Sequence, residues 1–342
     1  MSFCENDEKI AKVKECQKIL HDLGVALYFS YSTDGKYATD SREQKTVPDE
    51  FFHKVFKFCE EMNWGVHPII SYENIDSAIN NYNWFKEIFK QYRLNDGSDL
   101  PYFLEARNDG WTSETIEKYQ KFLYYILDDI FHEGANSNAE LFFDCFLRIF
   151  QKDSQNKYKF VEREAMLYNL LALNIENIVP CGIGLINLYI YMGDLSIIPC
   201  HRTAYPELRG GNFKIKNDKI VGITAAEGYN AYLHASHFHG AYRPGCVTCD
   251  YNDFCLKNCL GASYEKFGDI NIPVPSVCQL LQAKINTIVE YYHDVGIFHW
   301  LFQTEPEYPC NTSFKKLLLK LGYLEYEKYT DLGELRKDDY SS

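Results

Sequence analysis

The most distinctive residues of this chain are the cysteines between positions 246 and 259. They follow the pattern CxxC-x5-CxxxC, at Cys246, Cys249, Cys255 and Cys259. Cysteines this dense are rarely only small buried side chains, because thiolates at such spacing can converge on one soft inorganic centre. The loop therefore predicts a bound metal, either zinc or an iron–sulfur cluster.

Three further cysteines, Cys181, Cys200 and Cys278, extend the candidate ligand set to seven residues in predicted turns or at predicted strand ends. Seven thiols exceed the needs of a single tetrahedral zinc ion. Two zinc ions would take the seven thiols together with His201 or a member of the histidine group His234, His237 and His239. Two iron–sulfur clusters are equally compatible with this number, so ligand count leaves both chemistries open.

Composition bounds the compartment and the partners. The N-terminus reads MSFCENDEKI, without the basic and apolar character of a secretory signal, and polar residues and glycines interrupt the most apolar stretch, 178–199. We therefore expect a cytoplasmic protein with no membrane partner, in which clustered cysteines are ligands rather than disulfides. The formal net charge of −13 argues against sequence-independent binding to nucleic acid.

Helices alternate with short strands in the first part of the chain, which indicates βα units and a parallel sheet. The expected helices are 10–23, 52–62, 75–92 and one starting at Thr112 or Ser113; the expected strands are 25–30, 66–70 and 101–107. Three such units are too few to close a barrel, so we expect either part of a barrel or a small open sheet. Chemistry would lie beyond the carboxyl ends of the strands. The residues placed there are Ser30, Asp34, His67, Ser71, Glu105, Arg107 and Asn108.

The second part of the chain has less regular structure and more candidate ligands. We expect an apolar helix over 140–150, another near 163–173, and a hairpin of the runs 185–192 and 195–199 that turns at Gly193-Asp194. A polar loop after the predicted strand 25–30, over 31–45, and a turn-rich segment after Cys200-His201 complete the expected organisation.

The order Cys181…Gly193…Cys200, then CxxC-x5-CxxxC, then Cys278, resembles the SPASM domain. This is the auxiliary-cluster domain of radical S-adenosylmethionine (SAM) enzymes that modify peptides and proteins. The strand–helix units of residues 20–135 resemble the latter part of the radical SAM partial barrel. The resemblance implies an α/β chain with a partial (βα) barrel remnant at 1–135, a helical connector at 136–178, a small α+β SPASM-like iron–sulfur domain at 179–295 and a helical tail at 296–342.

The family's pattern implies two auxiliary [4Fe–4S] clusters. It assigns Cys246, Cys249, Cys255 and Cys278 to the outer cluster, and Cys181, Cys200 and Cys259 to the inner one. The inner cluster is one cysteine short, and in the family an open iron there can face the substrate. His201 occupies the position where sulfatase maturases have an aspartate base, so sulfatase maturation loses support.

The sequence lacks the CxxxCxxC motif that holds the catalytic cluster of radical SAM enzymes. S-adenosylmethionine is therefore expected as a cofactor only together with a missing N-terminal part. The chain would be a truncated reading of a full enzyme, the C-terminal subunit of a split enzyme completed by a radical SAM partner chain, or a degenerate relative. The expected function is radical modification of a peptide or protein substrate. The alternatives are a non-catalytic iron–sulfur protein for electron transfer or peptide binding, and a structural zinc protein.

Overall fold

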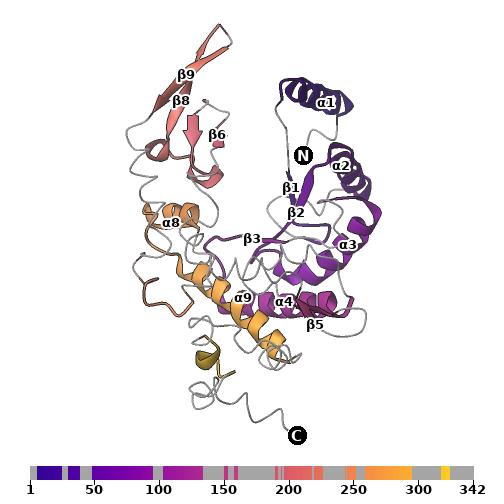
Figure 1. Cartoon of the computed structure of the whole chain (residues 1–342), viewed down its shortest axis with the longest axis vertical. Helices are drawn as coiled ribbons and strands as arrows, with labels where there is room; N and C mark the ends of the chain where they lie inside the picture. The colour runs from indigo at the N-terminus through magenta and orange to yellow at the C-terminus, as the bar shows by residue number, and fades with distance from the viewer. Residues whose placement is uncertain are drawn as a thin grey trace. The chain divides into compact units, whose positions relative to one another are not determined.

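The structure is a computed structural model that contains helices and sheets, as expected of an α/β protein (Figure 1). It describes residues 6–24, 30–38, 48–94, 103–133, 150–152, 158–160, 189–191, 194, 196–217, 219–225, 243, 245–251, 259–294 and 317–323. No helix within these ranges combines the length and the apolar character that crossing a membrane requires.

The chain divides into two compact units. The first comprises Met1–Ala106, Thr112–Asp144 and Lys152–Asn156. The second comprises Arg107–Trp111, Cys145–Gln151 and Lys157–Ser342. The chain therefore leaves the first unit at Arg107 and returns to it at Thr112, so that five residues between β3 and α4 belong to the second unit.

The first unit contains a three-stranded parallel sheet in the order β1-β2-β3. Its strands are β1 (Ser30–Thr33), β2 (Gly65–Ile70) and β3 (Leu104–Glu105). Its helices are α1 (Asp7–Asp22), α2 (Asp49–Met62), α3 (Ala78–Gln91) and α4 (Ser113–Glu133), and the 3-10 turn η3 (Ile75–Ser77) precedes α3. The predicted alternation of helices with parallel strands is confirmed.

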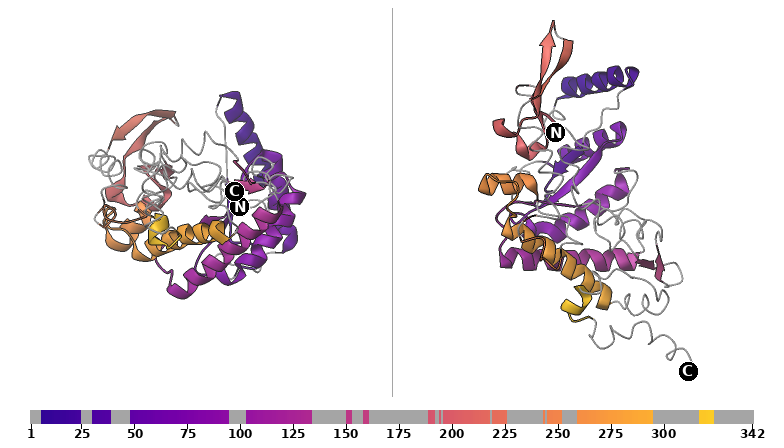
Figure 2. Two further views of the ribbon diagram at one scale, coloured as in Figure 1. Left: turned by 60° about the horizontal axis from the view of Figure 1, so that its bottom comes forward. Right: turned by 60° about the vertical axis from the view of Figure 1, so that its left-hand side comes forward.

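Helices α2, α3 and α4 bury the apolar faces that their sequences predict, whereas α1 has no buried residue. In α2, the residues Phe52, Val55, Phe56 and Cys59 recur at helical spacing and are buried. The helix ends where Asn63 adopts the left-handed conformation, with φ of 53°. Helices α2, α3 and α4 lie one beside the next in the views of this unit (Figures 1 and 2).

The strands differ in extent from the predicted ones. β1 begins at Ser30, where the predicted strand 25–30 ends, and residues 25–29 lie outside the described part of the chain. Tyr31 and Thr33 are buried while Ser32 is exposed, so the strand extends into the first three residues of the polar loop expected over 31–45. β3 covers only Leu104–Glu105 of the predicted strand 101–107.

The amide of Asn81 on α3 fixes the loop after β1. Its Nδ2 atom donates to the carbonyl oxygen of Asp34 at 2.9 Å, and its Oδ1 atom accepts from the backbone nitrogen of Tyr37 at 2.9 Å. Gly35 has φ of +91°, and any Cβ atom there would collide with Asn81. This loop is therefore a tight turn that depends on glycine.

The second unit contains a four-stranded antiparallel sheet in the order β6-β7-β8-β9, seen in salmon in Figure 1. Its strands are β6 (Tyr189–Tyr191), β7 (Ser196–Ile198), β8 (Gly211–Lys216) and β9 (Lys219–Ala225). The 3-10 turns η5 (His201–Thr203) and η6 (Pro206–Leu208) follow β7, and the helices α8 (Leu260–Phe267) and α9 (Pro275–Asp294) come later. A separate two-stranded sheet pairs β4 (Phe150–Lys152) with β5 (Tyr158–Phe160).

The predicted hairpin before Cys200 is confirmed as β6–β7, with Tyr191 paired to Ser196 around the turn. The segment expected to be turn-rich instead contains the β8–β9 hairpin. The predicted helix 140–150 is wrong at its end, because Phe150 lies in β4; residues 140–149 are outside the described part of the chain. The predicted helix near 163–173 is also outside it.

Candidate metal centre

Five of the seven predicted ligand cysteines lie among the described residues, all of them in the second unit and all half-buried. Cys200 follows β7 and begins η5, Cys259 is the N-cap of α8, and Cys278 lies in the first turn of α9. Cys246 and Cys249 share one turn. The other two, Cys181 and Cys255, and the histidines at 234, 237 and 239 lie outside the described residues.

Backbone hydrogen bonds hold the CxxC part of the loop in successive turns. The backbone nitrogen of Cys246 donates to the carbonyl oxygen of Arg243 at 2.9 Å, and that of Cys249 donates to the carbonyl oxygen of Cys246 at 3.0 Å. Gly245 permits this path because its φ is +81°. The two thiols are therefore presented from one short, internally bonded segment.

Arg243 is the most buried cation near these thiols, with 2% of its surface exposed. Its guanidinium donates to the carbonyl oxygen of Ile270. Burial lowers the pKa of Arg243, while the charges of Cys246, Cys259, Cys278 and Asp269 act in the opposite direction. Three of the predicted ligands thus lie close enough to one buried guanidinium to act on its charge.

Arg202 links two other thiols. Its backbone nitrogen donates to Sγ of Cys200 at 3.5 Å, and its Nη1 atom donates to Sγ of Cys259 at 3.7 Å. Cys200 and Cys259 come from a strand end and a helix start that are far apart in the sequence. One arginine therefore contacts both of them, and these are two of the three cysteines that the resemblance assigns to the inner cluster.

The guanidinium of Arg202 is held by two further groups. Its Nε atom donates to Oε1 of Glu265 on α8 at 3.0 Å, and its Nη2 atom pairs with Oε2 of the same carboxylate. Its Nη1 atom also donates to the carbonyl oxygen of Arg107 at 2.7 Å. Burial lowers the pKa of Arg202, but its hydrogen bond to Glu265 and the charges of Cys259, Glu265 and Cys200 outweigh burial, so the pKa is raised overall.

His201 lies beside the same group. Its Nδ1 atom is 3.7 Å from Sγ of Cys200. Burial, followed by the positive charge of Arg202, lowers the pKa of His201, and Glu265 only partly opposes this effect. The imidazole is therefore neutral at pH 7 and able to donate or accept one hydrogen bond beside the sulfur.

Apolar side chains line the thiols on their protein side. Cys200 packs with Leu208 and Tyr264 against the buried pair Leu260 and Ile270. Cys259 packs against a second cluster, formed by Ala262, Val274, Val277 and Leu281. These contacts lower the local dielectric constant, which strengthens the electrostatic interactions between the sulfurs and the two arginines.

The described residues fit a soft, sulfur-bound centre in their chemistry. The predicted ligands that can be placed are thiols, they are half-buried, and no disulfide joins any two of the described cysteines. Within the described ranges, no three His, Cys, Asp or Glu side chains lie close enough to hold one metal ion, in a set from which Cys181 and Cys255 are missing. The donor set matches zinc or iron–sulfur chemistry equally well.

The strand-end residues of the first part are only partly gathered at one edge. Asp34 and Ser71 directly follow β1 and β2, and Glu105 ends β3, where it accepts a hydrogen bond from Tyr119 at 2.8 Å. The other predicted positions are displaced: Ser30 starts β1, His67 lies inside β2, and Arg107 and Asn108 belong to the second unit.

The site predicted from the sequence did not include Arg202, Arg243 or Glu265. Arg243 stands three residues before the CxxC motif, so its position in the sequence was a usable signal. Glu265 carried no such signal, because its contact with Arg202 joins residues 63 apart in the sequence.

The chain matches no protein-family model and no curated protein.

Proposed function

We propose that the second unit is a SPASM-type domain that binds two auxiliary [4Fe–4S] clusters. In this proposal the chain is the C-terminal part or subunit of a cytoplasmic radical SAM enzyme that modifies a peptide or protein. The observation that carries the proposal is the burial of Arg243 beside Cys246, Cys259 and Cys278.

A buried arginine keeps its charge and therefore needs negative partners in the low-dielectric interior. Neutral thiols would provide little compensation, whereas metal-bound thiolates stay deprotonated. Asp269 supplies one negative charge near Arg243, and the sulfurs of the ligand set would add further negative charge. The CxxC-x5-CxxxC spacing and the total of seven thiols favour iron–sulfur clusters over a single zinc ion.

The proposed ligands keep the assignment implied by the resemblance. The outer cluster takes Cys246, Cys249, Cys255 and Cys278, and the inner cluster takes Cys181, Cys200 and Cys259. When bound, such clusters supply one-electron transfer. The surrounding residues of this chain would neutralise the sulfur charge through Arg243 and Arg202, and limit access of water through the apolar clusters.

The parallel βα units of the first part support the second element of the proposal, that they are a remnant of the radical SAM partial barrel. Reductive cleavage of S-adenosylmethionine would be supplied by a CxxxCxxC-bearing portion or partner chain. Co-expression with the product of the adjacent upstream reading frame, followed by assay for 5′-deoxyadenosine, tests this element. Production of 5′-deoxyadenosine by the 342-residue chain alone would contradict it.

The test of the cluster proposal is metal and sulfide analysis of the full chain purified without oxygen. We expect iron and acid-labile sulfide in similar amounts, with broad visible absorbance that decreases in Cys249→Ala. Cys16→Ala is the matched control, because Cys16 is an exposed cysteine on α1 in the first unit. Zinc without labile sulfide would replace the proposal by a structural zinc site.

The second candidate is a non-catalytic iron–sulfur protein for electron transfer or peptide binding. The absence of CxxxCxxC from this sequence favours it. It predicts the same iron and sulfide content, but no 5′-deoxyadenosine with any upstream partner.

A further inference from the structure

We propose that Arg202 is a positioning residue for the inner cluster, holding Cys200 and Cys259 at one centre and raising the reduction potential of that centre. This inference rests on the proposed function, because it concerns the same thiols. It adds a residue that the family resemblance does not assign.

Arg202 contacts the two sulfurs through different parts of the residue. The backbone nitrogen reaches Cys200, and the end of the side chain reaches Cys259. The distance between η5 and α8 is therefore bridged by the length of one arginine side chain. Thr203 fixes the η5 end, since its hydroxyl accepts from the backbone nitrogen of Cys200 at 3.0 Å and donates to the carbonyl oxygen of Cys200 at 2.8 Å.

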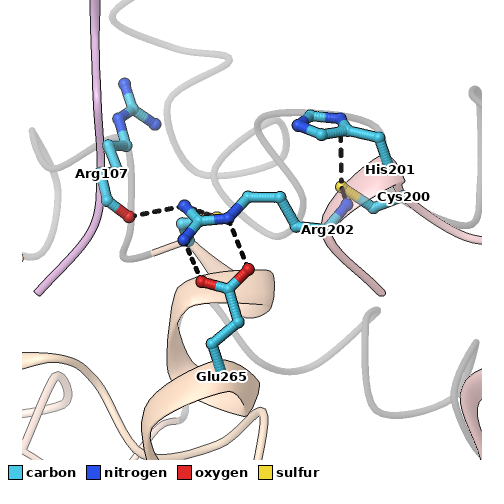
Figure 3. A network of polar contacts seen from close by, with 6 residues as sticks. Arg107, Cys200, His201, Arg202 and Glu265 are labelled. Carbon is cyan, nitrogen blue, oxygen red and sulfur yellow. Dashed lines mark hydrogen bonds and ion pairs between the residues drawn. The ribbon is translucent and has the colours of Figure 1, made fainter. Parts of the chain in front are cut away.

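The contacts of the Arg202 guanidinium fix its orientation. The paired contact with Glu265 occupies Nε and Nη2, and the carbonyl of Arg107 lies 2.7 Å from Nη1. Figure 3 shows the guanidinium between the carboxylate of Glu265 and the carbonyl of Arg107. In this orientation Nη1 also donates to Sγ of Cys259. A lysine has the same charge but a single nitrogen, so it cannot make these contacts together.

The contacts of Arg202 with the two sulfurs affect the reduction potential of the inner cluster. Both contacts of Arg202 with sulfur are N–H···S hydrogen bonds, and one donor carries a positive charge. Such bonds withdraw electron density from ligand sulfurs and stabilise the reduced cluster, which raises its potential.

The test is a redox titration of the full chain, purified without oxygen and followed by electron paramagnetic resonance, with iron and sulfide content measured in parallel. In Arg202→Gln we expect one of the two clusters to become harder to reduce by at least tenfold in its equilibrium constant, which is about 59 mV for one electron. The other cluster should keep its potential. Arg202→Lys should lower the potential of this cluster less than Arg202→Gln does, because lysine keeps the positive charge.

Two further variants make the result decisive. Glu265→Gln keeps Arg202 but weakens its anchor, so it should shift the same cluster in the same direction by less, and it provides the test if Arg202→Gln does not fold. Arg209→Gln is the matched control, because it removes an arginine–aspartate pair, Arg209 with Asp194 at 2.8 Å, in the same unit. The control should leave both potentials unchanged.

The two proposals fail in different ways. A wild-type chain without iron and sulfide overturns the cluster proposal, and with it the role of Arg202. A wild-type chain with both clusters, together with Arg202→Gln and Glu265→Gln proteins that keep their iron and both potentials, overturns only the role of Arg202.

Discussion

Gly261 lies against Arg202 so closely that a Cβ atom at position 261 would be 2.5 Å from Cβ of Arg202. Gly261 is in the first turn of α8, directly after the Cys259-Leu260 pair, and it is buried. The absence of a side chain there is what allows Arg202 to reach both the helix and the sulfur of Cys259.

We therefore expect Gly261→Ala to displace Arg202, although alanine is the better helix former. The variant should lower the iron content and shift one cluster potential in the direction of Arg202→Gln. Gly222→Ala on β9 is the control, since a Cβ there meets no atom within 4 Å. Equal iron content and equal potentials in both variants would show that Arg202 tolerates displacement.

Arg243→Met tests the observation behind the proposed function. With clusters bound, the substitution removes the buried counter-charge of the sulfurs, and we expect loss of iron and a stability loss on the order of 3 kcal/mol. In the metal-free protein the same substitution should cost less, because protonated thiols carry no charge for Arg243 to balance. Thermal unfolding with and without metal measures the difference. The same change in both forms would mean that the thiols do not serve as the counter-charge.

The first unit has a buried ion pair that permits a separate stability test. Nζ of Lys86 lies 2.6 Å from Oδ2 of Asp129, which also accepts from the hydroxyl of Tyr82 at 2.7 Å. The side chains of the pair are 9% and 19% exposed, so Asp129→Ala removes an anionic partner of a nearly buried ammonium.

We expect Asp129→Ala to cost on the order of 3 kcal/mol in urea unfolding. The exposed pair Lys90–Glu87 on the same helix is the control, and Glu87→Ala should cost less than about 1 kcal/mol. A small loss in Asp129→Ala would indicate that Lys86 reaches water when the aspartate is removed.

His67 gives the first unit a pH dependence. Burial lowers the pKa of His67 from its ordinary value of 6.5, so the folded chain binds this proton more weakly than the unfolded chain. Its contribution to stability is present above about pH 6.5 and is lost as the pH falls through the lowered pKa.

We expect His67→Gln to flatten the fall in stability below that pH, as measured by urea unfolding at a series of pH values. His21→Gln on α1 is the control, because the side chain of His21 is 87% exposed. The titration of His67 itself can be followed by NMR, with the variant assigning its signal. A His67 signal that titrates at or above 6.5 would contradict the burial argument.

The spacing of apolar residues and the turn residues predicted the elements that neighbouring residues determine. The stripe of Phe52, Val55, Phe56 and Cys59 predicted α2, and the turn at Gly193-Asp194 predicted the β6–β7 hairpin. The β8–β9 hairpin was not predicted, because its strands expose most residues on both faces and their sequences show no apolar alternation.

The candidate centre divides in the same way. The cysteines were visible as a spacing, and that spacing is a property of the chain. The contact of Arg202 with both Cys200 and Cys259 was not visible, because Arg202 and Cys259 are 57 residues apart in the sequence. Contacts of this kind arise from tertiary packing, and a single sequence carries no periodicity that marks them.

The five residues Arg107–Trp111 determine how this protein can be dissected into fragments. They belong to the second unit, yet residues of the first unit flank them on both sides. The carbonyl of Arg107 accepts from Arg202, and the carboxylate of Asp109 binds Lys266 at 2.7 Å and Ser276 at 2.9 Å. A fragment that begins after residue 144 would lack these groups. The isolated cysteine-bearing half would therefore lose the partners of Arg202, Lys266 and Ser276 that this segment supplies. Supplying this pentapeptide, by fusion or as a circular permutant, is the condition for studying that half alone.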